Sequence, residues 1–292
     1  MIQNSSFCYL LSGTAAWRQF GLFFSNPDKM NFKIAANLTE LRAKSPLVQN
    51  ITNFVVMNYT ANALLAIGAS PVMAHAAEEV EDMVSIAGAL VVNIGTLSPQ
   101  WVEGMKKAML AARKLNKPIV LDPVGAGATP YRNSVLSELL TSAPPTLIRG
   151  NGSEILALAG ANVQTKGVDS TTNSTDSLQA AKLLSEQFGC VVSVSGATDV
   201  IVSGDKVAYV QNGVSLMTRV TGMGCSASAI AGAFCAIQPD VFQAAVSAAV
   251  IMGVCGEKAF EKAQSPGSFQ ISFLDALAEI TAEELELLAV VK

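Results

Sequence analysis

The feature that most constrains the fold is an alternation of short apolar runs with longer amphipathic segments. Residues 89–96 (ALVVNIGT) and 118–123 (PIVLDP) are brief and rich in aliphatic and β-branched residues, as strands buried on both faces are. Between them, residues 98–117 have a helical pattern with Ser98 as an N-cap and Pro99 at the first helical position. Strands that alternate with helices favour right-handed crossover connections and a parallel sheet. The sequence therefore predicts an α/β fold with a mostly parallel central sheet covered by helices on both faces.

The same pattern continues into the second half of the chain. Strands are expected at residues 146–150 and 190–196, and helices at residues 132–140 and 151–160. Residues 198–213 are expected to form a hairpin. After Gly224 the pattern is helical to the end. Because no low-complexity tract or linker divides it, we expect residues 31–292 to form a single domain. Residues 1–30 lack the alternation, and we expect them to be a poorly ordered extension.

Composition excludes several classes of partner. The chain has 292 residues, a net charge of −4 and a pI near 5.1, and its basic residues do not cluster as nucleic-acid binding requires. Five cysteines without C-x-x-C spacing indicate a reducing, cytoplasmic location rather than disulfides or structural zinc. The apolar run at residues 241–256 is shorter than the roughly 20 residues of a membrane span, so we interpret it as a buried helix. A small-molecule substrate is the expected partner.

Polar residues follow the predicted strands where ligands of such sheets bind. Asp122, Arg149 and Ser195 end three of them, and Glu154 lies in the turn that starts the next helix. The two carboxylates could hold a magnesium ion directly or through its waters, or could simply cap helices. Arg149 suits a nucleotide phosphate, because a planar guanidinium group engages oxygens in pairs. His75 is the only histidine, which excludes Ser-His-Asp chemistry, and we interpret it as a residue on a helix face.

A glycine-rich turn, TGMGC, leads into the next helical segment. The backbone N–H groups of Gly222, Met223 and Gly224 could surround an anion there, although a tight turn with close helix packing would use the same residues. Cys225 follows at the helix N-terminus, which would lower the pKa of its thiol and let it accept a proton. A small buried packing residue is the alternative for Cys225, and it is our interpretation of Cys235.

From about Ser45 to Leu277 the chain resembles the hydroxyethylthiazole kinases, a thiamine-pathway family of the ribokinase-like superfamily. The segments that carry the resemblance are SPLVQNITNFVVMNYTANALLAIGASPVM, VNIGTLSPQ, DPVGAGAT, IRGNGSEILAL, KGVDS, VTGMGCSASA and SPGSFQISFLDAL. The resemblance implies a ribokinase-like fold without a separate lid domain. It also implies ATP-dependent phosphorylation of the hydroxyl of 5-(2-hydroxyethyl)-4-methylthiazole, with Mg²⁺, by a homotrimer whose sites lie at subunit boundaries.

The resemblance also implies a role for each candidate residue. Cys225 stands where the wider superfamily has the aspartate that deprotonates the substrate hydroxyl. The resemblance implies substrate contacts for Met73 and Gly222, and nucleotide contacts for Arg149 and Ser195. It also implies an anion hole formed by Gly222, Met223 and Gly224, and a magnesium site formed by Asp122 and Glu154. Two positions depart from many relatives, which have Thr at Ser195 and Thr or Ala at Met223, and the bulkier Met223 could reshape the edge of the substrate pocket.

Two other functions remain open on the sequence. A kinase for another small alcohol, such as hydroxymethylpyrimidine or a sugar, would be expected to carry Asp at position 225. A nucleotide-binding regulatory protein that lost its base would carry Cys there, as this chain does.

Overall fold

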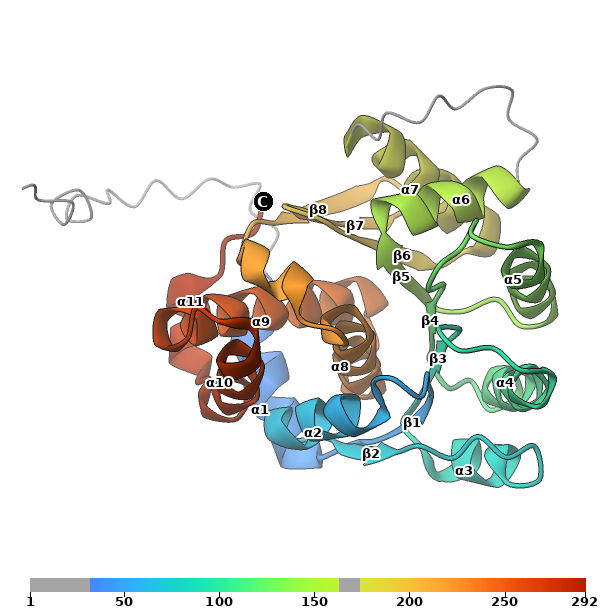
Figure 1. Ribbon diagram of the computed structural model, residues 1–292, viewed down its shortest axis with the longest axis horizontal. Coiled ribbons are helices and arrows are strands. Elements are labelled where there is room, and N and C mark those ends of the chain that lie inside the picture. Colours follow the sequence, from blue (N-terminus) through green and yellow to red (C-terminus); the bar gives the residue numbers. More distant parts are fainter. Residues whose placement is uncertain (1–31, 163–173) are drawn as a thin grey trace, which may run out of the picture. The chain divides into compact units, whose positions relative to one another are not determined.

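An eight-stranded sheet lies at the centre of the part of the chain that the structure describes (Figure 1). The computed structural model describes residues 32–162 and 174–292. The strands are β1 (Leu47–Ile51), β2 (Ser70–Val72), β3 (Ala89–Asn93), β4 (Ile119–Asp122), β5 (Leu147–Asn151), β6 (Val191–Ser195), β7 (Asp199–Ser203) and β8 (Lys206–Val210). Their order is β2-β1-β3-β4-β5-β6-β7-β8. The first six pair in parallel and the last two are antiparallel, which confirms the predicted mostly parallel sheet.

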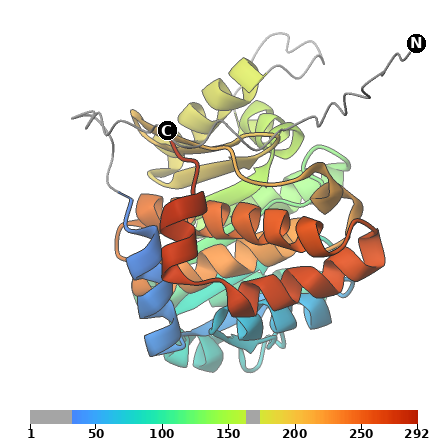
Figure 2. The same cartoon turned by 90° about the vertical axis from the view of Figure 1, so that its left-hand side faces the viewer.

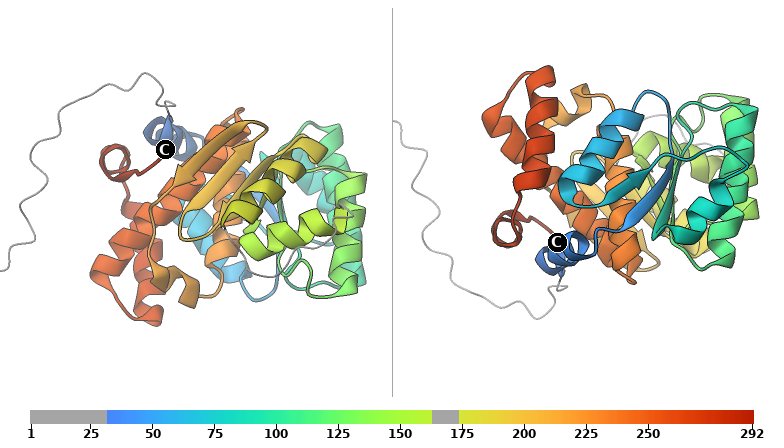
Figure 3. Two further views of the ribbon diagram at one scale, coloured as in Figure 1. Left: turned by 90° about the horizontal axis from the view of Figure 1, so that it is seen from above. Right: turned by 90° about the horizontal axis from the view of Figure 1, so that it is seen from below.

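Helices cover both faces of this sheet (Figures 1 and 3). One layer consists of α1 (Ile34–Lys44), α2 (Met57–Ile67), α8 (Met223–Ile237), α9 (Val241–Lys262), α10 (Pro266–Glu279) and α11 (Ala282–Leu288), seen in front in Figure 2. The other consists of α3 (Val80–Ile86), α4 (Pro99–Lys114), α5 (Pro130–Ser142), α6 (Gly152–Asn162) and α7 (Ser174–Phe188). Successive strand residues alternate between the layers: Val91 packs in the first core, and its neighbours Leu90 and Val92 pack in the second. The central strands β3 and β4 are therefore buried on both faces, as their apolar composition predicted.

The helix α8 lies directly on the middle of the sheet. It packs against β1, β3 and β4, and Gly232 permits this close approach. A Cβ atom at Gly232 would lie 2.4 Å from Val91 Cγ2 and 3.4 Å from Val48 Cγ1. The position of α8 brings its N-terminus, with Cys225, over the carboxyl ends of these strands.

Most predicted elements are present with small shifts of their ends. Ser98 caps α4 by accepting a hydrogen bond from the N–H of Trp101, and the hairpin turns between Ser203 and Lys206. The helix α9 is long and apolar enough to cross a membrane, but 78% of its most apolar stretch is buried within the protein, which confirms the interpretation as a core helix.

Two local predictions are wrong. His75 is not on a helix: it lies between β2 and α3, where its ring is 4.5 Å from the ring of Trp101. The C-terminal segment is not helical to its end, since Val291 bridges Val210 after α11. The extension expected at residues 1–30 and the KGVDS segment (166–170) lie outside the described residues.

Candidate active site

The carboxyl ends of the parallel strands carry most of the candidate residues. Asp122 is the last residue of β4, Arg149 lies near the end of β5, and Ser195 is the last residue of β6. Glu154 follows β5 in the first turn of α6. Because α8 begins above the same edge, Cys225 lies close enough to Asp122 and Arg149 for both charges to act on its thiol.

The glycine-rich turn has the backbone geometry that an anion site needs. Gly222 has a φ of 89°, a conformation that glycine adopts without strain, and a Cβ there would lie 3.2 Å from Val56 Cγ1. The helix α8 begins at the next residue, Met223, and no described side chain caps it. The first N–H groups of α8 and the positive end of its dipole are therefore available to an anion.

A chain of hydrogen bonds joins Cys225 to Asp122. Asn53 Nδ2 donates to Cys225 Sγ at 3.4 Å and to Asn93 Oδ1 at 2.9 Å. Asn93 Nδ2 donates to Asp122 Oδ2 at 2.8 Å, and Ser228 Oγ donates to the same oxygen at 2.8 Å. The donors of two asparagines and a serine thus fix the positions of the thiol and the carboxylate.

The environment of Cys225 overturns one expectation. Burial raises the pKa of the Cys225 thiol, and the negative charge of Asp122 raises it further; hydrogen bonds from the two asparagines and the charge of Arg149 only partly oppose this. The sequence predicted a lowered pKa from the helix N-terminus alone. It could not show that the residue is largely removed from water and faces a carboxylate.

Asp122 is the most perturbed acid of the site. Its side chain is 3% exposed, and burial raises its pKa to about 7, against the opposing charge of Arg149 and the hydrogen bond from Ser228. Glu154 adds a further upward shift of the pKa, because the two carboxylates repel each other. A divalent cation bound to these carboxylates would favour the ionised form of Asp122 and offset the repulsion between the two negative charges.

Glu154 has a clear structural role. Its Oε1 accepts a hydrogen bond from the N–H of Gly125 at 2.9 Å, and its Oε2 accepts one from the N–H of Asn151 at 2.9 Å. Asn151 Oδ1 in turn accepts from the N–H of Glu154 at 3.0 Å, which caps α6. Of the two readings left open by the sequence, the helix cap is therefore present, and the magnesium role stays a prediction.

The donor set nevertheless fits magnesium. Mg²⁺ in phosphoryl-transfer sites uses one or two carboxylates and completes its shell with water and phosphate oxygens. Within residues 32–162 and 174–292 no cluster of three or more His, Cys, Asp or Glu side chains could hold a metal ion. Asp122 and Glu154, acting with such oxygens, remain the candidate residues for such an ion.

A cavity of about 570 Å³ adjoins this site. Arg149, Ser195, Met223 and Gly224 line it, together with the segment that follows β8 and part of α9. Arg149 Nη1 donates to the carbonyl oxygen of Gly224 at 3.1 Å, so the guanidinium group is held against the start of α8. The volume is in the range of sites for small ligands and cofactors.

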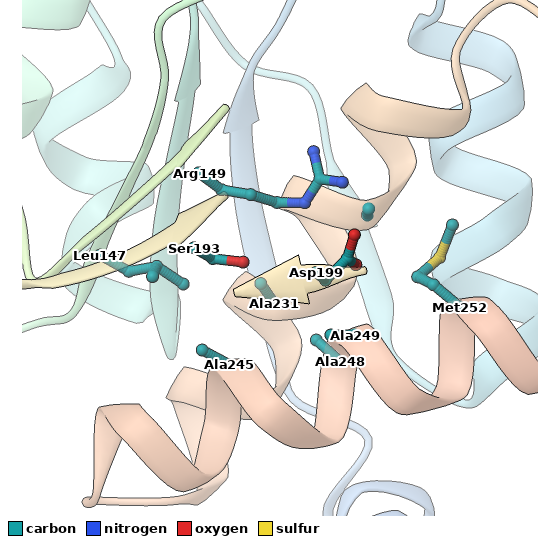
Figure 4. Close-up of a pocket in the computed structure, with 10 residues that line it drawn as sticks. Leu147, Arg149, Ser193, Asp199, Ala231, Ala245, Ala248, Ala249 and Met252 are labelled. Atoms are coloured by element: carbon teal, nitrogen blue, oxygen red, sulfur yellow. The ribbon is translucent and has the colours of Figure 1, made fainter. Parts of the chain in front are cut away.

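Arg149 also lies near a second acid, the half-buried Asp199, and both residues line a small pocket next to this cavity (Figure 4). Burial raises the pKa of Asp199, while the charge of Arg149 and the N–H of Gly196, which donates at 2.9 Å, oppose the shift. Arg149 therefore compensates two acids, Asp122 and Asp199, and presents a cation to the cavity.

The remaining candidates lie toward the other end of the sheet edge. Met73 directly follows β2, the outermost strand next to β1, and its carbonyl oxygen lies 3.3 Å from His75 Nδ1. Gly222 packs against Val56 and Tyr59 near the start of α2. Met73 thus follows the outermost strand at one end of the sheet, whereas Arg149 and Ser195 lie on β5 and β6, on the other side of β4.

Sequence reasoning missed three residues of the hydrogen-bond chain: Asn53, Asn93 and Ser228. Asn93 ends the apolar run of β3 just as Asp122 ends that of β4, so the same rule about strand ends could have found it. Ser228 lies one turn after Gly224 in α8, whose hydrophobic composition hides a single buried hydroxyl.

Known proteins match this chain over almost its full described length. The model of the hydroxyethylthiazole kinase family matches residues 38–283. The chain belongs to the hydroxyethylthiazole kinase family. A hydroxyethylthiazole kinase of Leptospira biflexa is 56% identical over 250 residues, which cover 86% of this chain and 94% of that protein. One of Leptothrix cholodnii is also 56% identical, over 83% of this chain and 89% of that protein.

Solved structures give the same result for the fold. The structure of a hydroxyethylthiazole kinase protein from Pyrococcus horikoshii is 44% identical and superposes with a TM-score of 0.83, over 89% of this chain and 98% of that one. A pyridoxal kinase from Staphylococcus aureus has a TM-score of 0.55 at 16% identity, over 73% of this chain and 88% of that one, and shows the shared ribokinase-like fold alone. As a member of the hydroxyethylthiazole kinase family, the protein is a phosphotransferase.

Proposed function

We propose that the protein transfers the terminal phosphoryl group of ATP to the hydroxyl of 5-(2-hydroxyethyl)-4-methylthiazole, a step of thiamine biosynthesis or salvage. The observation that carries the proposal is the family match over residues 38–283, which includes the complete TGMGC turn. Its geometric support is that this turn, which ends at Cys225, lies close to Asp122 and Arg149 at one edge of the sheet.

The cavity of about 570 Å³ is the proposed site of ATP. Phosphoryl transfer depends on in-line positioning and on neutralisation of the charge on the transferred group. Arg149 supplies a fixed cation at the cavity wall, and Ser195 supplies a hydroxyl at its edge. The N–H groups at the start of α8, from Gly222 to Gly224, would then surround the phosphoryl oxygens as an anion hole.

Cys225 is the proposed base for the substrate alcohol. Only its thiolate can accept the hydroxyl proton, and the raised pKa leaves a smaller fraction of thiolate at neutral pH. We therefore expect assistance from Cys225 rather than dependence on it, since the proton leaves easily once transfer is under way. The thiazole ring would lie toward Met73 and Gly222, on the side of Cys225 away from Arg149.

Asp122 and Glu154 are the proposed residues for Mg²⁺. When bound, Mg²⁺ neutralises negative charge on the phosphates. Asn93 and Ser228 hold the Asp122 carboxylate in place, and the N–H groups of Gly125 and Asn151 hold that of Glu154. The protein thus contributes two oriented carboxylates, and Arg149, whose charge acts on Asp122, lines the nucleotide cavity.

A homotrimer in the cytoplasm is the proposed setting, as the family resemblance implies. Its support in this chain is apolar surface next to the site: Phe54 is 64% exposed and Val55 67%, directly after Asn53. Exposed apolar side chains that cluster near a site are typical of protein interfaces.

The test is an assay of ADP release with a panel of alcohols. We expect turnover that depends on Mg²⁺ with the thiazole alcohol, and little with hydroxymethylpyrimidine or a sugar. If another alcohol is turned over faster, that alcohol becomes the proposed substrate. Nucleotide binding without turnover of any alcohol would favour the regulatory alternative.

A further inference from the structure

One wall of the cavity is a segment with no strand or α-helix of its own. Residues 212–218 connect β8 to α8 through a short 3-10 helix, and Asn212, Gly213, Val214 and Met217 of this segment line the cavity. The helix α9 also lines the cavity, through Met252 and Gly253. The shape of the nucleotide cavity therefore depends on what holds this segment in place.

Asn212 faces the cavity, but its amide group is occupied by protein atoms. Its Oδ1 accepts a hydrogen bond from the N–H of Val290 at 2.7 Å, and its Nδ2 donates to the carbonyl oxygen of Leu288 at 2.9 Å. The same Nδ2 also donates to Glu257, at 3.2 Å to Oε2. Because both amide donors are in use, Asn212 is not a residue that recognises a nucleobase through them.

Glu257 and Gly253 complete the attachment to α9. Glu257 Oε1 accepts a hydrogen bond from the N–H of Gly213 at 2.8 Å, which is a charge-assisted bond. A Cβ at Gly253 would lie 2.5 Å from Asn212 Cβ and 2.6 Å from its carbonyl oxygen, so only glycine allows this approach. The segment is thus held against α9 at Asn212 and Gly213.

The C-terminal residues hold the other side of Asn212. They run antiparallel to the edge strand β8: the N–H of Tyr209 donates to the carbonyl oxygen of Lys292 at 2.8 Å, the N–H of Lys292 donates back at 3.0 Å, and the N–H of Gln211 donates to Val290 at 3.0 Å. Figure 1 shows the C-terminus at this edge. The match to the family model ends at residue 283, so this segment lies beyond it.

We propose that residues 288–292 are a positioning segment for the nucleotide site, acting through the amide of Asn212. They extend the sheet at its edge and fix the wall of the cavity without touching the bound nucleotide. The inference rests on the proposed function only in taking the cavity to be the ATP site. Loss of the segment should weaken the binding of nucleotide and leave the binding of the alcohol unchanged.

The experiment measures ATP and ADP affinity by calorimetry, together with KM for both substrates. The variants are a chain that ends at Leu287, which removes both the Leu288 and the Val290 hydrogen bonds to Asn212, then Asn212→Ala, and the two combined. A hydrogen bond contributes about 1 kcal/mol, so losing two of them should weaken nucleotide binding by roughly five- to fiftyfold, with KM for the alcohol changed less than about twofold. The combined variant should lose no more than the larger single change, because both act on one contact.

Two further variants make the result decisive. Leu287→Ala is the matched control, since Leu287 is next to the segment but 83% exposed, and it should bind nucleotide as the native protein does. Val290→Pro removes the N–H that donates to Asn212 and carries the test if the shortened chain does not fold. Native nucleotide affinity in folded variants, or an additive loss in the combined one, would overturn the proposal.

The design separates this inference from the proposed reaction. If the native protein binds ATP but does not phosphorylate the thiazole alcohol, the proposed reaction fails and the affinities still decide the role of the segment. If the native protein binds no nucleotide, the assignment of the cavity fails and the inference fails with it.

Discussion

Cys225 is the single residue whose replacement discriminates best between catalysis and packing. Cys225→Ala keeps Arg149, the anion hole and the carboxylates, so we expect turnover to fall toward the low end of the roughly 10²–10⁴-fold that a general base contributes. Cys225→Asp should stay active, because a carboxylate ionises at lower pH than a thiol whose pKa burial has raised. The measurement is kcat for both variants, with the melting temperature as a control for folding.

The pH dependence sharpens this prediction. The raised pKa of Cys225 places its ionisation above neutral pH, so kcat/KM of the native protein should rise as the pH increases through that value. In Cys225→Asp the rise should move to lower pH. If the residue only packs, the alanine variant would be fully active and the aspartate variant would be destabilised.

The raised pKa of Asp122 predicts that the free energy of unfolding depends on pH in the absence of metal. Its pKa is about 7 in the folded protein against 3.8 ordinarily, so its neutral form is stabilised by folding. This contribution is complete below about pH 4 and is lost as the pH rises through 7, at about 1.4 kcal/mol for each unit of pKa shift. Asp122→Asn removes the ionisation, so its melting temperature relative to that of the native protein should increase between pH 5 and pH 8.

Magnesium provides the control for that experiment. At pH 8 Mg²⁺ should raise the melting temperature of the native protein, because it binds the ionised carboxylates, and should raise that of Asp122→Asn less. Parallel melting curves for the two proteins across this pH range, with and without Mg²⁺, would contradict both the raised pKa and the metal assignment.

Elements of the fold were more predictable than their contacts. The apolar runs that end at Asn93 and Asp122 located β3 and β4, because strands buried on both faces have continuous apolar sequences. The raised pKa of Cys225 could not be predicted in the same way, since it depends on burial by segments far away in the sequence. The sequence predicted a helix face for His75, which was wrong, because His75 lies in the loop after β2, where its ring contacts that of Trp101.

The packing of α8 on the sheet gives a prediction for a whole element. Gly232→Ala would place a Cβ 2.4 Å from Val91 Cγ2, so either the helix or the strand must move. Overpacking of this kind costs about 1–3 kcal/mol of unfolding free energy. Because the movement would displace Cys225 as well, turnover should fall together with the melting temperature.

Gly160, a helical glycine away from α8, serves as the control. Gly160 lies in the helix α6, and no described heavy atom is within 4 Å of the position of a Cβ there. Gly160→Ala should stabilise the protein by about 0.5–1 kcal/mol through helix propensity, and leave turnover unchanged. Equal effects of the two substitutions would show that α8 is not held closely against β3.

At the scale of the whole molecule, exposed apolar residues directly follow a residue of the site. Asn53 donates to Cys225, and the next two residues, Phe54 and Val55, are 64% and 67% exposed. The ring of Phe54 lies 4.6 Å from that of Trp101, which fixes the direction of this loop. A neighbouring subunit packed on the loop would therefore control the position of Asn53 as well as cover apolar surface.

The proposed homotrimer leads to a linked prediction for assembly and activity. The native protein should have the mass of a trimer by light scattering, and Val55→Asp should shift it toward smaller species because a charge would be buried at the interface. Turnover per subunit should fall at the protein concentrations at which the trimer dissociates, because the same loop contains Asn53, which donates to Cys225. Leu110→Asp is the matched control: Leu110 is 50% exposed on α4, in the other helical layer, and should change neither property. A native monomer with full activity, or a Val55→Asp trimer, would rule out this loop as the interface.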